Sequence, residues 1–229
     1  MSITAHVEID RVCKAIFQAI FERRLEPNTR LIENELAKAL SSSRSNVRQA
    51  LLVLEQRNLV QIIPNKGAVI AEPSQQDAAE VFAARLCIES KILDIVIEKV
   101  KAKDLKQLRS HLKKEKQARE EQQRHTLIYL TGKFHLLLAE IAANQVFIDF
   151  LNQLIARSSL ILEKYEIQGK NNCAEEDHSK LVQLIAEGDR KKALALLTNH
   201  LESIEQNLNF KPSIKPDDLQ DVFASMNLS

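Results

Sequence analysis

Apolar residues recur every three or four positions along most of this chain, which is the periodicity of an amphipathic helix. The pattern predicts a first helix over residues 9–25. Beyond Pro73 it continues with little punctuation and predicts further helices over residues 74–100, 102–122, 124–143, 145–167, 175–187 and 190–209. Amphipathic helices of this length with short connections pack as a bundle, so we predict an all-α antiparallel bundle of six or seven helices.

The pattern differs between residues 31 and 70, where the predicted elements are shorter. A narrow apolar stripe predicts a short helix over residues 33–40, and three serines then interrupt it. Ser43 is placed to cap a second helix, because its hydroxyl can accept from the free amides of the first turn. The apolar face of that helix consists of Val47, Ala50, Leu51 and Leu54. Its other side presents Arg44, Ser45 and Arg48.

Two β-prone runs follow over residues 59–63 and 68–71, and the turn residues between them predict a β-hairpin. Two helices joined by a tight turn and followed by a hairpin describe a winged helix-turn-helix, whose second helix enters the DNA major groove. Arg44 would then contact bases, while Lys66 at the hairpin tip would reach a phosphate or the minor groove and Gly67 would permit close approach. The alternative is a helical hairpin and ribbon that only pack.

Composition and charge agree with a mainly α protein in two parts. Gly and Pro are scarce, at 4 and 5 residues. Before Pro73 there are 10 Lys and Arg against 8 Asp and Glu, and from there on 22 against 23. The front part therefore carries a small positive net charge, which favours contact with phosphate. We predict a winged helix-turn-helix domain over residues 1–73 and a helical effector-binding and dimerisation domain over residues 74–210. For the tail over residues 211–229 the alternatives are a short docked helix and a disordered segment.

Cysteine spacing and hydropathy narrow the class of protein further. Cys13, Cys87 and Cys173 are odd in number and widely spaced, which argues against a disulfide framework or a zinc finger. No window approaches the roughly 18 apolar residues of a membrane span, and the N-terminus carries charges where a signal peptide has its apolar core. We therefore expect a soluble, cytoplasmic protein with no membrane partner.

The front part resembles a known family. The residues that carry the resemblance are Pro27, Leu31, Glu35-Leu36-Ala37, Ser43-Arg44-Ser45, Val47-Arg48, Ala50-Leu51, Leu54-Glu55, Leu59-Val60, Pro64-Asn65 and Gly67-Ala68. Together they are similar to the DNA-binding domain of the GntR family of bacterial transcription regulators. Asn28, Asn46 and Gln49 depart from it, because the family usually has Gly, Pro and Glu there. The expected DNA contacts are Asn34, Ser43, Arg44, Ser45, Arg48, Lys66 and Gly67, with Asn34 standing where several members carry Arg.

Three histidines on separate predicted helices can reach a common point. His178 lies ten residues before Gly188 and His200 lies twelve after it. At the helical rise these are about 15 Å and about 18 Å from the turn, so antiparallel helices hold the two rings nearly level. His135 lies on a largely apolar helix that faces a core, where a histidine needs a partner. The alternative is three unrelated helix histidines, one or two of them hydrogen-bonded in the core.

The back part is similar in kind and spacing to the FCD ligand-binding domain of the FadR subfamily of GntR regulators. The matching residues are Arg85 to Glu89, Phe134-His135, Ala142-Ala143-Asn144, Arg157, Asp177-His178, Gly188-Asp189, Ala193 and His200-Leu201. The resemblance implies a divalent metal held by an Asp and three His, with a small carboxylate effector beside it. His135, His178 and His200 match those histidines, whereas Thr131 stands where the Asp is usual.

Loss of that carboxylate predicts a weaker three-histidine site that favours zinc or nickel over magnesium or calcium, or a site that has exchanged the metal for a directly bound ligand. We place Arg85, Arg157 and Thr131 near the effector, because Arg binds carboxylates through two hydrogen bonds. An ion pair with Glu89 within the same helix is the competing role for Arg85.

Other polar residues are expected to have structural or solvated roles. The charge-rich segment over residues 101–124 predicts a solvated helix face, with DNA contact as the alternative. Asn144 is expected to end a helix as its C-cap. The side chains expected in solvent are His6, Arg23, Arg24, His111 and His125, with DNA contact as the alternative for Arg23 or Arg24.

These predictions describe a homodimeric transcription regulator, a repressor rather than an enzyme. Two recognition helices would address a double-stranded, pseudo-palindromic operator, and a small-molecule effector in the helical domain would control operator affinity. One alternative is a metal-dependent hydrolase with a vestigial DNA-binding domain, because three histidines with an open position resemble a catalytic zinc site. Another is an architectural DNA binder without an effector.

Overall fold

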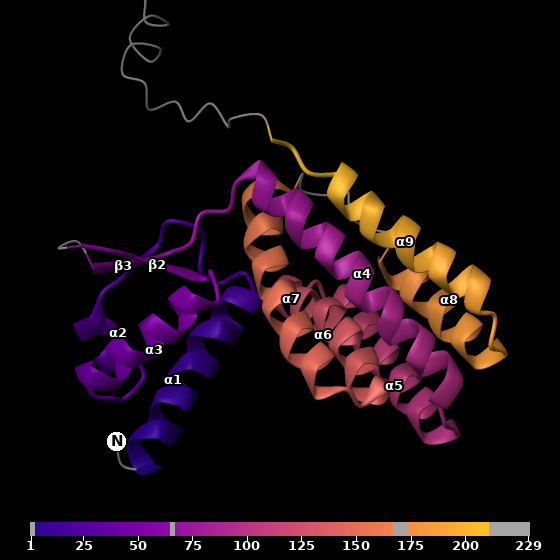
Figure 1. The fold of residues 1–229 in the computed structure, drawn as a ribbon, viewed down its shortest axis with the longest axis horizontal. Coiled ribbons are helices and arrows are strands. Elements are labelled where there is room, and N and C mark those ends of the chain that lie inside the picture. The colour runs from indigo at the N-terminus through magenta and orange to yellow at the C-terminus, as the bar shows by residue number, and fades with distance from the viewer. Residues whose placement is uncertain (1–2, 65–66, 167–173, 211–229) are drawn as a thin grey trace, which may run out of the picture.

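The computed structural model describes residues 3–64, 67–166 and 174–210. A small winged part lies beside a bundle of helices (Figure 1). The winged part contains α1 (Ile3–Phe21), β1 (Arg30–Leu31), α2 (Glu33–Ala39), α3 (Arg44–Gln56), β2 (Val60–Ile63) and β3 (Gly67–Ile70). The bundle contains α4 (Gln75–Lys99), α5 (Ala102–Glu120), α6 (Arg124–Ala142), α7 (Gln145–Tyr165), α8 (Ala174–Glu187) and α9 (Arg190–Gln206). The predicted fold class is confirmed, with six bundle helices in the described ranges.

Serine caps set the starts of α3 and α4, as predicted. The backbone amide of Asn46 donates to Ser43 Oγ at 3.1 Å. At α4 the Asp77 amide donates to Ser74 Oγ, and the Ser74 amide donates back to the Asp77 carboxylate, which is a complete capping box. The predicted apolar face of α3 is also confirmed, since its four residues are the buried ones of that helix.

The wing is a three-stranded antiparallel sheet in the order β1-β3-β2. The predicted hairpin is present as β2 paired with β3, with Gln61 opposite Val69. The strand β1, which pairs Arg30 with Val69, was not predicted. A two-residue strand is too short to show a periodicity of its own. Lys66, Cys173 and the predicted tail over residues 211–229 lie outside the described residues.

The predicted bounds of α1 were wrong at both ends, because the helix spans Ile3–Phe21. Its end is set by Arg23, which has a φ of 52°. The amide of Arg23 donates to Ile20 O and that of Arg24 to Ala19 O, both at 2.9 Å. This pair of bonds is the usual closure of a helix C-terminus, and glycine is its usual sequence marker. Arginine at that position gives no such signal.

Asn144 also has a different role from the one predicted. It caps the start of α7, because the amides of Val146 and Phe147 donate to its Oδ1 at 3.1 and 3.3 Å. The end of α6 is instead closed by Ala143, which has a φ of 54°. A short polar side chain between two helices serves either end, and the sequence does not say which.

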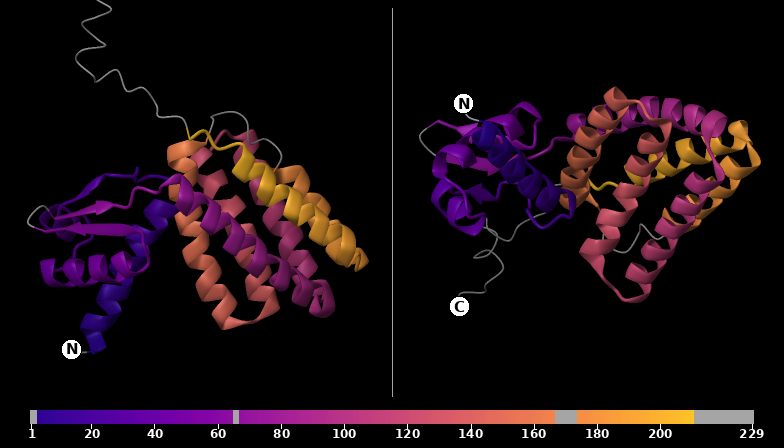
Figure 2. Two further views of the ribbon diagram at one scale, coloured as in Figure 1. Left: turned by 45° about the horizontal axis from the view of Figure 1, so that its top comes forward. Right: turned by 90° about the horizontal axis from the view of Figure 1, so that it is seen from below.

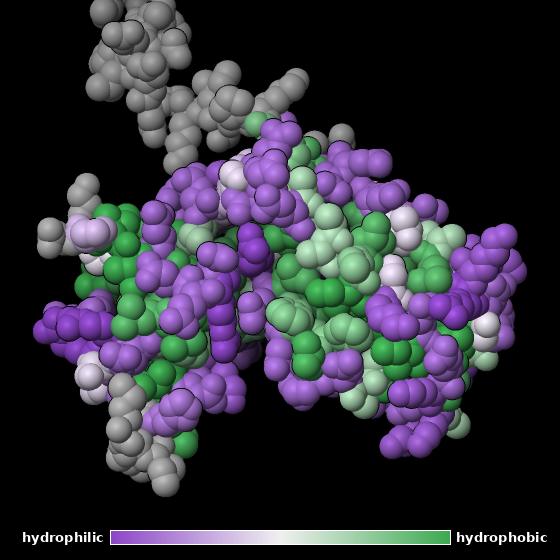
Figure 3. All heavy atoms as spheres, in the orientation of Figure 1, coloured by the Kyte–Doolittle hydropathy of each residue, from purple (hydrophilic) through white to green (hydrophobic). Residues whose placement is uncertain are grey.

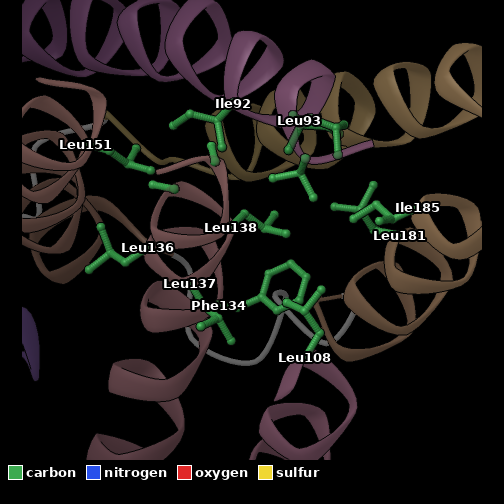
Figure 4. Close-up of a cluster of buried hydrophobic side chains, with 14 of the residues drawn as sticks. Ile92, Leu93, Leu108, Phe134, Leu136, Leu137, Leu138, Leu151, Leu181 and Ile185 are labelled. Atoms are coloured by element: carbon green, nitrogen blue, oxygen red, sulfur yellow. The ribbon is translucent and has the colours of Figure 1, made fainter. Parts of the chain in front are cut away.

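The main core lies inside the bundle. Figure 4 shows side chains from α4, α5, α6 and α8 meeting between the helices, among them Leu93, Leu108 and Phe134. These three side chains have no exposed surface. Burial of this kind fixes how α5, α6 and α8 lie against one another, and it therefore fixes the histidines that those helices carry.

The winged part meets the bundle through α1 and α7. Ala156 and Leu160 of α7 belong to the same buried cluster as Ile20 and Leu54 of the winged part. The two views of Figure 2 show that the C-terminal end of α1 is the end that meets the bundle. The Phe21 ring at that end packs edge-on against Tyr129 of α6, with 5.3 Å between ring centroids.

Gly132 on α6 makes room for the Phe21 ring. A Cβ at residue 132 would lie 2.3 Å from Phe21 Cε2, and the ring is only 3% exposed, so it has little freedom to move away. We expect Gly132→Ala to lower the free energy of unfolding by about 1 to 3 kcal/mol in urea titrations, although alanine favours helices. Phe21→Leu should relieve part of this loss in the double variant, and strictly additive effects would contradict the contact.

Candidate functional site

The N-terminal turn of α3 presents the two arginines predicted to contact DNA. The side chains of Arg44 and Arg48 are 62% and 60% exposed, so neither is part of the core. Both face Glu33 of α2: Arg48 donates to its two carboxylate oxygens at 2.8 Å each, and Arg44 Nη2 lies 3.6 Å away. The side chains of Asn34, Ser43 and Ser45 are exposed on the same part of the fold, as is Gly67.

Three histidines from α6, α8 and α9 come together inside the bundle. His135, His178 and His200 each offer a ring nitrogen, and these nitrogens lie within 4.8 Å of one another. The rings are 4%, 1% and 6% exposed. Phe134 stacks on the His178 ring at 4.0 Å between centroids and covers one side of it. The structure therefore brings together all three histidines that helix geometry placed near one another.

Each histidine ring is held through its Nδ1 by a different carboxylate. Glu89 of α4 lies 2.6 Å from His135, Glu115 of α5 lies 3.1 Å from His178, and Asp177 of α8 lies 3.0 Å from His200. A carboxylate at Nδ1 fixes the ring and leaves Nε2 for a ligand, which is the usual outer-shell arrangement of metal-binding histidines. His178 Nε2 is buried and has no hydrogen-bond partner in the described structure.

Burial and neighbouring charge set the protonation of these groups. Burial lowers the pKa of His135, and it lowers the pKa of His178 to about 4 despite the hydrogen bond to Glu115. Burial alone would raise the pKa of Glu89, but the Arg85 guanidinium and the His135 ring outweigh it and lower that pKa to about 2. A neutral His135 or His178 ring whose Nδ1 donates to a carboxylate keeps a lone pair on Nε2, which a metal requires.

A cavity of about 220 Å³ adjoins the three rings. Four arginines line it, namely Arg23, Arg85, Arg119 and Arg124, against two carboxylates, Glu166 and Asp177. The hydroxyl oxygens of Thr131, Ser158 and Ser159 add polar atoms to the wall, although each hydroxyl proton is donated to a carbonyl of its own helix. An excess of guanidinium groups, with hydroxyls among apolar side chains, suits a small anionic ligand such as a carboxylate.

Two of the three residues expected near an effector line this cavity. Thr131 does so, but its Oγ1 donates to the carbonyls of Leu127 and Ile128 in its own helix. Arg85 also lines the cavity, and its Nε donates to Glu89 at 2.7 Å, so the ion pair considered for it is present. The hydroxyl proton of Thr131 is therefore used within α6.

The expectation for Arg157 needs correction. Its Nη2 donates to Asp77 Oδ1 at 3.1 Å, and its side chain does not line the cavity beside the histidines. The neighbouring Ser158 and Ser159 line it instead. Successive residues on a helix point about 100° apart, so one position decides which side chain faces the cavity.

Several side chains expected in solvent have partners in the fold. His111 Nε2 lies 2.8 Å from Leu130 O, and His125 Nδ1 lies 2.9 Å from Glu22 O. Arg23 is 9% exposed and pairs with Glu166. Within the charge-rich segment, Glu115 has no exposed surface. These expectations were wrong because the sequence alone does not show whether a polar residue on a helix faces solvent or a neighbouring helix.

Sequence reasoning did not place any of the carboxylates that hold the three rings beside a histidine. Glu89 and Asp177 lie in segments that carry the family resemblance, which was the one available signal. Glu115 lies four residues after His111 and contacts it at 3.2 Å as well as His178. Burial alone would raise the pKa of Glu115, but the neighbouring His111 and His178 rings outweigh it and lower that pKa.

Known families match both parts of the chain. The family described as "Bacterial regulatory proteins, gntR family" matches residues 8–70, and the FCD domain matches residues 80–203. The chain belongs to the GntR family. The FCD match places it with the family members that combine this winged domain with an FCD domain, as the FadR-type architecture does.

Relatives of this GntR chain include other regulators. It is 29% identical over 127 residues to the uncharacterized HTH-type transcriptional regulator YdhC of Bacillus subtilis and 27% identical over 133 residues to McbR of Escherichia coli. Those segments cover 55% and 58% of this chain, and only 57% and 60% of the two relatives. The HTH-type transcriptional repressor RspR of Escherichia coli is 23% identical over 185 residues, covering 80% of this chain and 81% of RspR.

A solved structure supports the fold. The structure of Escherichia coli McbR/YncC superposes with a TM-score of 0.79 at 22% identity, covering 85% of this chain and 93% of that one. YdhC, McbR and RspR are all named as transcription regulators, and none of the three is named as an enzyme. Within the described ranges, no helix combines the length and the apolar character that crossing a bilayer requires.

Proposed function

We propose that this GntR-family chain binds a double-stranded DNA operator and that an anion held in the bundle controls its operator affinity. The observation that carries the proposal is the exposed pair Arg44 and Arg48 at the capped N-terminus of α3, within the segment that matches the gntR family. In a winged helix-turn-helix, residues at this end of the recognition helix reach base edges in the major groove. Asn34, Ser43, Ser45, Gly67 and Lys66 complete the proposed contact set.

The proposal includes the division into a DNA-binding domain over residues 1–73 and an effector domain over residues 74–210. It also includes a homodimer, because two winged domains are needed to address a pseudo-palindromic operator. Hydrophobic side chains gather on the bundle face where α4 runs (Figure 3), and Ile88 and Ile95 of α4 are only partly buried. Such a face is suited to a contact between bundles.

A divalent metal fits the three histidines. His135, His178 and His200 would be its ligands, and the carboxylates at their Nδ1 atoms would orient them. All three ligands are imidazoles, which favours zinc or nickel over magnesium or calcium. The bound ion would attract the effector carboxylate, while Arg85 would contribute hydrogen bonds from the cavity wall. Thr131 would line the effector cavity without binding the metal.

We propose repression relieved by the effector as the mode of regulation. A relative across most of the chain, RspR, is named as a repressor. An effector that binds one relative placement of the winged domains better than the other would change the fit to the operator half-sites. The hydrolase alternative is not supported, because both family matches belong to regulators, as does RspR.

Arg44→Ala and Arg48→Ala test the DNA-binding proposal. Each should weaken binding to a genomic fragment that the wild type retains by about 10- to 100-fold, because a guanidinium that reads a base contributes about 1 to 3 kcal/mol. The measurement is a binding titration at fixed salt, since operator affinity varies steeply with ionic strength. Arg24→Ala is the matched control, because Arg24 is also an exposed arginine but lies at the end of α1. Unchanged binding by both α3 variants would refute the proposal.

A further inference from the structure

One wall of the cavity comes from the winged part of the chain. Phe21 and Arg23 line the cavity beside residues of the bundle, although Phe21 is the last residue of α1 and Arg23 lies two residues beyond it. The neighbouring Glu22 carbonyl lies 2.9 Å from His125 Nδ1 of α6. The cavity is therefore complete only when the end of α1 is docked against the bundle.

Arg23 is held in this wall by an ion pair. Its Nη1 donates to Glu166 Oε2, and the two side chains are 7% and 18% exposed. Arg23 Nε is buried and has no hydrogen-bond partner in the described structure. A guanidinium that is buried in a cavity wall and uses only part of its donor capacity can donate to a further anionic oxygen.

The backbone of Arg23 is suited to a substitution test. Its left-handed φ of 52° closes α1, and the same backbone conformation occurs at Ser41, Asn58 and Gln122, where other helices end. The backbone conformation of Arg23 is therefore ordinary for a residue that ends a helix. The burial of its side chain is the feature that sets it apart. Because glycine is the preferred residue at such a position, Arg23→Gly removes the guanidinium without straining the turn.

The end of α1 is connected mechanically to the recognition helix. Val12, Ile16 and Ile20 of α1 are in one buried cluster with Val47, Ala50 and Leu54 of α3. These side chains are at most 2% exposed, so the two helices move as one packed unit. A change in what holds Arg23 therefore acts on the placement of α3.

We propose that Arg23 is an effector-binding residue supplied by the winged domain, and that the anionic group of the effector displaces Glu166 from it. This inference rests on the proposed function, because it assigns a residue and a coupling route to the same cavity. Without the effector, Glu166 would hold Arg23 and the end of α1. In the occupied cavity the effector anion holds Arg23, so the contact between α1 and the end of α7 changes with occupancy.

The test measures binding of two anions, succinate and inorganic phosphate, to the full-length protein by calorimetry at constant ionic strength. Arg23→Gly should weaken binding of the anion that the wild type takes up by about 10-fold or more, the effect of losing one charge-assisted hydrogen bond. Glu166→Gln should strengthen binding, because the competing carboxylate is gone. Arg24→Gly should leave the affinity unchanged, because the Arg24 side chain is 56% exposed and pairs with Glu22.

The opposite effects of Arg23→Gly and Glu166→Gln distinguish competition from a general loss of structure, since damage to the fold weakens binding in both variants. Unchanged affinity in Arg23→Gly, weaker binding in Glu166→Gln, or no saturable binding of either anion by the wild type would overturn the inference. Operator binding is measured on the same samples. Absence of DNA binding by the wild type would refute the proposed function. In Arg23→Gly the anion should no longer release the operator, whatever the operator affinity of that variant without the anion.

Discussion

Zinc added to metal-free, untagged protein is expected to raise the midpoint of thermal unfolding, and His135→Ala is expected to abolish that rise. An ion that binds only the folded state stabilises it by about 3 kcal/mol when its free concentration is 100 times Kd. For a chain of this size that corresponds to a shift of about 5 to 10 °C. The physical basis is the convergence of three buried ring nitrogens within 4.8 Å of one another. Nickel should produce a comparable shift and magnesium a much smaller one.

His6→Ala is the matched control for this experiment, because His6 is an exposed histidine far along the chain from the bundle. That variant should respond to zinc as the wild type does. Glu115→Gln should weaken the response without abolishing it, because Glu115 holds His178 at Nδ1 and is not itself a proposed ligand. An equal zinc response in the wild type and in His135→Ala would place the bound ion elsewhere and contradict the proposed centre.

The sequence predicted that the three histidines lie close together, because the number of residues from the turn is enough to place two of them. A turn at Gly188 with nearly equal distances on either side sets His178 level with His200 whatever the rest of the fold does. His135 is placed by its apolar helix, which can only face the core. The carboxylates could not be found in this way. Glu115 and Glu89 reach the rings from α5 and α4, so their roles depend on how four helices pack.

The fold was predictable where a local signal existed. Ser43 and Ser74 each directly precede a segment in which apolar residues recur at helical spacing, and both are helix N-caps in the structure. Arg23 had no comparable signal, because arginine at the end of a helix usually remains in solvent and favours the helix dipole. Its role follows from the docking of α1 on α6 and α7, which is a property of packing between the two parts of the chain.

Acid is expected to destabilise the metal-free protein well before its exposed carboxylates protonate. His178 has a pKa of about 4 in the folded state, below the ordinary value of 6.5. Between these values the unfolded chain binds a proton that the folded chain does not, so stability falls as pH decreases from about 6.5 towards 4. The groups that face His178 are Glu115, which opposes this shift, and His135 and His200, which add to it. Glu89 continues the loss below pH 4.5, since its folded pKa is about 2.

The expected loss from His178 is about 3 kcal/mol across that range, because one pKa unit corresponds to about 1.4 kcal/mol. Urea titrations at a series of pH values, with chelator present, measure it as the slope of the free energy of unfolding against pH. His178→Gln should flatten the slope between pH 4 and 6.5, whatever its effect on absolute stability, and His6→Ala should leave it unchanged. A wild-type slope that is already flat, or one that His178→Gln preserves, would show that this ring is protonated as easily in the folded chain as in the unfolded one. Glu115 would then hold a charged His178 ring below about pH 6.5, and in that range a metal would have to displace its proton in order to bind.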